Sequence, residues 1–205
     1  MAEQEDAQAQ HNTPKCALQR IYIKDASFES PSSPAVFTKS WKPKMHVDLN
    51  TRSQPVGENS YEVTLTVTVT AKLEEDETAF LVEVQQAGLF VAEGIEGEAL
   101  RQLLGIACPN MLFPYVRESV DALAVKGGFP ALALQPVNFE ALYRQAKAQA
   151  DRDMHGCHGA FFDIERVKYQ KVGIVLFQPV ADHHDPAIAL GRIFAARDKA
   201  GFLQA

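Results

Sequence analysis

The residues best suited to metal chemistry lie in the C-terminal part of the chain. The run Met154-His155-Gly156-Cys157-His158 is followed by His183 and His184. Thioether, thiolate and imidazole groups are ligands that zinc and copper accept. Their spacing, however, matches none of the usual structural zinc patterns. We therefore favour a polar segment with incidental histidines over a metal site.

Enzyme signatures are missing from the sequence. It contains neither a glycine-rich phosphate-binding motif nor the nucleophile elbow of hydrolases. Cys108 precedes Pro109 in an apolar stretch, so we expect a buried structural thiol rather than a nucleophile. We predict that the protein is not an enzyme and uses no cofactor.

The charge balance limits the choice of partners. The 205 residues include 26 acidic and 20 basic side chains, which gives a net charge of −6. This balance disfavours nucleic acids and anionic membranes, which need basic surfaces, and permits a basic polypeptide partner. Residues 151–205 hold seven acidic and seven basic residues, so the whole excess lies in residues 1–150.

The ends and the cysteines indicate a cytoplasmic protein. Three cysteines at wide spacing form no disulfide framework. The N-terminus lacks the basic and apolar regions of a secretory signal. No apolar run approaches the roughly 20 residues of a membrane span. Residues 1–17 have few large apolar side chains, and we predict that they are disordered.

Period-2 alternation predicts strands. It holds over 61–73, where apolar residues alternate with threonines and charged residues, and 79–91 forms a second strand after a short charged turn. Shorter candidates are 19–23 and 44–50. Four strands that precede the helices indicate an α+β protein with an antiparallel sheet.

Three helices are predicted after the strands. The first covers 98–107 and is interrupted by Pro109, and the second covers 113–125 and ends at a pair of glycines. Asn138 is a good N-cap for the third.

Two patterns leave alternatives open. Leu81 shares a strand face with Glu83, which indicates either an interface or an isolated exposed leucine. Trp41 and Phe129 lie in predicted loops. Such aromatics either plug the core or, when several line a groove, bind apolar peptide, and a nearby sheet edge can add backbone hydrogen bonds.

Several longer strings resemble one family. Examples are FLVEVQQAG at 80–88 and CPNMLFPYVRE at 108–118. The other matching stretches are 21–29, 34–37, 61–63, 67–71, 94–97 and 136–143. Together they resemble SecB, the bacterial protein-export chaperone, in order over about 18–150. We expect a SecB-like domain there, preceded by the segment 1–17 and followed by an atypical extension, 151–205.

The resemblance implies a fold and a function. The fold is a four-stranded antiparallel sheet with helices on one face, and the assembly is a homotetramer, a dimer of dimers. Helix 113–125 either builds the dimer-of-dimers contact or packs only within the protomer. Members hold unfolded precursor polypeptides in a translocation-competent state and deliver them to SecA, without ATP or metal. The alternative is a SecB-like chaperone dedicated to an antitoxin.

The resemblance also suggests site residues. The SecA-binding candidates are Asp25, Glu29, Leu81 and Glu83. The client-binding candidates are Trp41, Phe80, Phe90, Phe139 and Tyr143. The extension departs from the family pattern of a short polar tail. One interpretation is an accessory segment that packs on the core or covers part of the groove. The other, which we slightly favour, is a weakly ordered product of a shifted reading frame.

Overall fold

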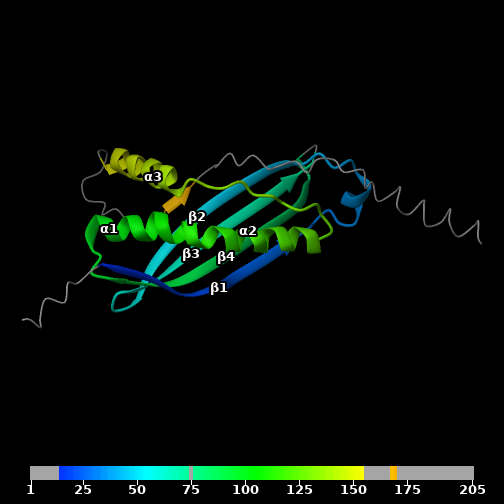
Figure 1. The fold of residues 1–205 in the computed structure, drawn as a ribbon. Coiled ribbons are helices and arrows are strands. Elements are labelled where there is room, and N and C mark those ends of the chain that lie inside the picture. Colours follow the sequence, from blue (N-terminus) through cyan, green and yellow to red (C-terminus); the bar gives the residue numbers. More distant parts are fainter. Residues whose placement is uncertain (1–13, 74–75, 155–166, 170–205) are drawn as a thin grey trace, which may run out of the picture.

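The computed structural model describes residues 14–73, 76–154 and 167–169. Four long strands form an antiparallel sheet: β1 (Lys15–Glu29), β2 (Lys44–Gly57), β3 (Ser60–Lys72) and β4 (Thr78–Glu93). The predicted four-stranded sheet is therefore confirmed. A short fifth strand, β5 (Val167–Tyr169), extends it, and the strand order is β1-β4-β3-β2-β5 (Figure 1). Strand β1 begins at Lys15, so residues 15–17 belong to the sheet and not to the polar N-terminal segment.

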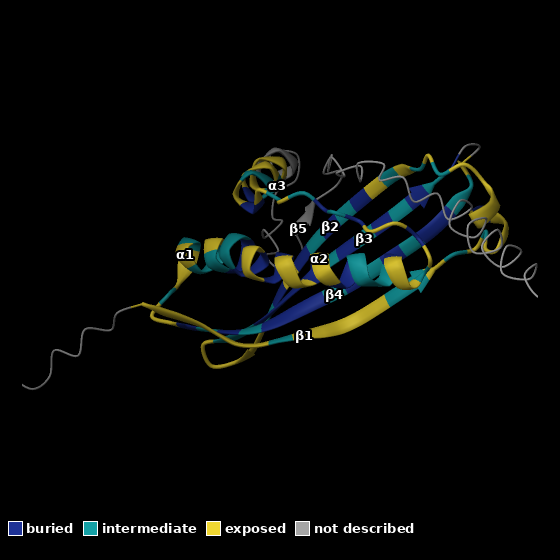
Figure 2. Cartoon of the chain, turned by 45° about the vertical axis from the view of Figure 1, so that its right-hand side comes forward, coloured by how far each residue is buried: buried dark blue, intermediate teal, exposed yellow. Residues whose placement is uncertain are grey.

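β1, β2 and β4 are longer than their sequence patterns predict, whereas β3 has the predicted length. β1 was expected over 19–23 only, and its outer edge is unpaired among the described residues. Most of its side chains are exposed, as Figure 2 shows. An edge strand buries little on either face, so hydrophobic alternation alone does not reveal its length.

The alternation in β3 has its predicted meaning along most of the strand. Val63, Leu65, Val67 and Val69 are fully buried on the face that meets the helices. Glu62, however, is also buried although it belongs to the polar set. Polar side chains from β1 and β2 cover it on the opposite face of the sheet.

One continuous helical run crosses the inner face of the sheet. It comprises α1 (Gly97–Gln102), the π-helical turn η3 (Leu103–Ala107) and α2 (Cys108–Lys126). The predicted interruption at Pro109 is wrong. Proline cannot donate the backbone hydrogen bond of an α-helix, and the wider π turn immediately before it changes the hydrogen-bond spacing at that point.

The remaining helices follow their sequence signals. The backbone amide of Gly127 donates to the Leu123 carbonyl at 2.9 Å where α2 ends. Helix α3 (Phe139–Met154) is capped by Asn138, whose Oδ1 accepts a bond from the amide of Ala141 at 2.9 Å. A 3-10 turn, η1 (Ala35–Thr38), lies between β1 and β2. Within the described ranges, no helix is both long and apolar enough to cross a membrane.

Candidate functional site

Five aromatic rings gather at one end of the sheet, and we call them the aromatic cluster. Phe28 lies near the end of β1, Phe37 in η1, Trp41 before β2, Phe80 near the start of β4 and Phe129 after α2. Phe129 is central: its ring centroid is 4.8 Å from that of Phe80, 5.2 Å from that of Phe37 and 5.3 Å from that of Trp41. Segments far apart in sequence thus build one apolar surface.

One side of the aromatic cluster is buried in the protein, and the other side is exposed to solvent. Phe80 and Phe129 are buried, Trp41 and Phe28 are half-buried, and Phe37 is 52% exposed. An exposed phenylalanine beside four other rings is a surface that gains stability from a further apolar side chain. The geometry therefore suits an apolar segment of a polypeptide.

Polar contacts fix the connector that carries Phe37 and Trp41. Ser30 Oγ donates to the Ala79 carbonyl at 2.8 Å, and Ser32 Oγ donates to the Thr78 carbonyl at 2.9 Å. Lys39 forms an ion pair with Glu77, and its hydrogen bond lowers the pKa of that carboxyl. The connector is thereby attached to the start of β4, beside Phe80.

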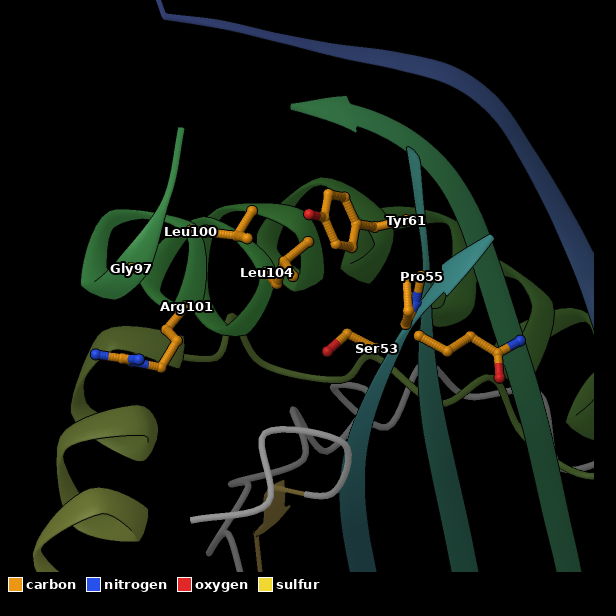
Figure 3. A pocket seen from close by; sticks show the side chains of 8 residues that line it. Ser53, Pro55, Tyr61, Gly97, Leu100, Arg101 and Leu104 are labelled. Atoms are coloured by element: carbon orange, nitrogen blue, oxygen red, sulfur yellow. The ribbon is translucent and has the colours of Figure 1, made fainter. Parts of the chain in front are cut away.

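A small cavity lies at the opposite end of β2. Its volume is about 280 Å³. The lining residues are Ser53, Gln54, Pro55, Tyr61, Gly97, Leu100, Arg101 and Leu104. In Figure 3, Tyr61 of β3 faces Leu104 of the helical run, and Arg101 lies at the rim beside α3. Strand β2 therefore leads from the aromatic cluster to this cavity.

The structure divides the predicted client residues. Trp41 and Phe80 belong to the aromatic cluster. Phe90 and Phe139 are fully buried, and the Phe139 ring packs edge-on against Phe113 with centroids 5.9 Å apart. Tyr143 is buried against Gly105 in η3. These three side chains lie in the protomer's interior away from the cluster.

Two members of the cluster were missed by sequence reasoning. Phe28 lies near the end of an edge strand, and Phe37 lies in a proline- and serine-rich connector. Nothing in their local pattern separates a groove-lining ring from a core plug. The nearby Trp41 was the available signal, because it also lies in a predicted loop.

The four predicted SecA-binding residues lie together on the sheet face that points away from the helices. Glu29 is opposite Leu81 in the β1–β4 register, Ser27 is opposite Glu83, and Asp25 is opposite Gln85. Asp25 and Glu29 are exposed, and Leu81 and Glu83 are partly exposed. We call Asp25, Glu29, Leu81 and Glu83 the acidic patch.

The acidic patch keeps its charge unneutralised. Glu83 accepts hydrogen bonds from Thr68 Oγ1 at 3.0 Å and from Gln85 Nε2 at 3.3 Å, which orient it without a cation. None of the ion pairs found between described residues includes Asp25, Glu29 or Glu83. Three carboxylates that share a sheet face with one leucine fit a basic partner that also buries apolar surface.

A second polar group on this face holds β1 in place, and we call it the Glu62 cluster. Glu62 accepts bonds from the Tyr22 hydroxyl, from Lys24 Nζ at 2.7 Å and from Gln54 Nε2 at 2.5 Å. Burial raises the pKa of Glu62, but these three donors and the Lys24 charge outweigh it, so the pKa is lowered. The same contact raises the pKa of Tyr22 to about 12.

The candidate metal residues are outside this geometry. His158, His183 and His184 lie outside the described residues, as do His155 and Cys157. Among the described residues, no group of three or more His, Cys, Asp or Glu side chains could hold a metal ion. Cys108 is buried, and burial raises the pKa of its thiol, as expected of a structural cysteine.

A family model described as preprotein translocase subunit SecB matches residues 9–150. This chain belongs to the SecB family. It is 61% identical over 133 residues to protein-export protein SecB of Hahella chejuensis, covering 65% of this chain and 83% of that protein. It is 51% identical over 158 residues to the protein of the same name from Marinobacter nauticus, covering 76% and 95%.

A more distant solved structure shares the SecB name. A SecB-like chaperone of Mycobacterium tuberculosis, solved with an antitoxin peptide, superposes with a TM-score of 0.49 at 16% identity, covering 60% of this chain and 89% of that one. The high identity to the protein-export members favours the export chaperone over the antitoxin alternative. The family match ends at residue 150, where the predicted extension begins.

Proposed function

We propose that this chain is an ATP-independent cytoplasmic chaperone that holds precursor polypeptides unfolded and delivers them to SecA. The observation that carries this is the aromatic cluster, with Phe37 exposed over buried Phe80 and Phe129. Apolar burial tolerates many client sequences, since it is non-directional, and therefore suits a holdase.

The two proposed surfaces are separate on the molecule. The aromatic cluster lies on the helix side, where Phe129 follows α2, and the acidic patch lies on the far face of β1 and β4. A client and SecA can therefore bind at the same time. This arrangement is what delivery from one to the other requires.

An exposed apolar surface on α2 is the third feature of the proposal, and it is consistent with assembly into a homotetramer, a dimer of dimers. Met111, Tyr115 and Val125 on α2 are 44%, 50% and 52% exposed. With Ala122 they lie three, four or seven residues apart, which places them on one side of the helix. An apolar stripe of this kind on an otherwise packed helix fits a partner helix.

The client surface is tested by aggregation assays. Combined Phe37→Ser and Trp41→Ala substitutions should reduce suppression of precursor aggregation about tenfold, because they remove the open part of the cluster. Val56→Ser is the control, since Val56 is equally exposed, at 52%, and lies outside the cluster. Unchanged suppression by the double variant would remove the cluster from the proposal.

The acidic patch is tested by calorimetry with SecA. Glu83→Lys and Asp25→Lys should each weaken binding by about three- to tenfold, more at low salt, while aggregation suppression stays intact. Glu58→Lys is the matched control, because Glu58 is an exposed acid at the β2–β3 turn. Equal weakening by all three would indicate a general charge effect and not a docking patch.

A further inference from the structure

Strand β2 has an edge that most of the described chain leaves open. Its 14 residues pair with β3 from Lys44 to Gly57. On the other side, the described pairing is confined to Leu49–Thr51, opposite β5. Backbone amides and carbonyls along an open strand edge are a template for another extended segment.

This edge joins the aromatic cluster to the cavity. Trp41 of the aromatic cluster immediately precedes β2, and Ser53 to Pro55 line the cavity at its far end. At about 3.3 Å per residue, the part of β2 before the cavity spans roughly 30 Å. An extended polypeptide that reaches both the cluster and the cavity along β2 passes Leu49–Thr51, where β5 lies.

β5 comes from the extension that follows the family match. It contacts both β2 and α3, and Figure 1 shows it between them. Val167 pairs with Thr51, Lys168 with Asn50 and Tyr169 with Leu49. Its backbone therefore takes the position along β2 that an added client strand would take.

Two features make β5 a replaceable occupant. It supplies only three paired residues on a 14-residue edge. The side-chain oxygens Oδ1 of Asn50 and Oγ1 of Thr51, both opposite β5, are buried with no hydrogen-bond partner in the described structure. A longer segment that carries a side-chain donor on each face of the sheet would satisfy these oxygens and pair with more of the edge, and so displace β5.

We propose that β5 is an internal competitor for the strand-acceptor edge of β2, so that the extension limits client binding until a client displaces it. The inference rests on the proposed client-binding function. Tethering gives β5 a high local concentration at the edge, and its shortness keeps the contact weak. β5 then acts as an accessory strand that covers part of the β2 edge.

The test uses the full chain and an unfolded probe, reduced and carboxymethylated α-lactalbumin. In a strand, adjacent amides point in opposite directions, so a Val167→Pro and Lys168→Pro double variant removes a donor whichever way β5 faces. Its affinity for the probe should rise about three- to tenfold, because a competing state is removed. The Val167→Ala and Lys168→Ala double variant keeps both amides and should bind the probe as the parent chain does.

Hydrogen exchange and a second variant complete the test. The proline variant should lose amide protection within Leu49–Thr51. A chain ending at residue 154, which keeps the whole of α3, should bind the probe as tightly as the proline variant. Lost protection with unchanged affinity would refute the competition, and unchanged protection would refute the pairing itself. If neither the parent nor any variant binds the probe, the proposed chaperone function fails, which is a separate result.

Discussion

Replacing Glu62 with glutamine should loosen β1, the strand that carries Asp25 and Glu29 of the acidic patch. Glutamine keeps the shape of the side chain, removes its charge and turns one acceptor into a donor. At least one of the three donors in the Glu62 cluster then loses its acceptor. Hydrogen bonds to charged groups contribute about 1.5–3 kcal/mol each.

The exposure of the donors reduces this magnitude. The Lys24 side chain is 42% exposed and Tyr22 is 36% exposed, so water replaces part of what they lose. We therefore expect Glu62→Gln to lower the free energy of unfolding by about 1–2 kcal/mol at neutral pH.

The pH dependence gives an independent check. The folded pKa of Glu62 lies below the unfolded value of about 4.3. The stabilisation is therefore complete above that value and is lost as the pH falls through the lowered folded pKa. The stability difference between the parent and Glu62→Gln should accordingly shrink as the pH falls below about 4.

Urea unfolding at a fixed protein concentration measures both effects, since assembly makes apparent stability concentration-dependent. Glu58→Gln is the matched control, because Glu58 is exposed and forms no ion pair among the described residues. Equal urea midpoints for the parent and Glu62→Gln at pH 7 would refute the role of the cluster. A difference that persists unchanged in acid would refute its electrostatic origin.

Two other predictions concern packing and assembly. Gly88→Ala should destabilise the fold by about 1–3 kcal/mol, because the added methyl would lie 2.6 Å from the Phe90 ring and 3.0 Å from Leu112. An unchanged thermal midpoint would show that the neighbouring side chains move aside to accommodate the methyl group. Tyr115→Asp should convert the tetramer to a dimer by light scattering, because it charges the exposed apolar stripe of α2. A tetramer that persists would assign this stripe another role.

The sequence predicted the elements whose pattern is local. The alternation in 61–73 predicted β3, because a strand buried on one face must alternate. Asn138 predicted the start of α3 through its capping oxygen. The strings at 80–88 and 108–118 indicated the family, and with it the grouping of Asp25, Glu29, Leu81 and Glu83 on one sheet face.

Contacts between distant segments were decided only by the tertiary structure. Phe28 and Phe37 join Phe129 because β1, η1 and the end of α2 meet at one end of the sheet, and no local pattern records that meeting. Pro109 stays inside a helical run, directly after the π turn that joins α1 to α2. The pairing of β5 with Leu49–Thr51 is likewise visible only in the tertiary structure. It depends on which edge of the sheet is open and not on the three residues of β5 themselves.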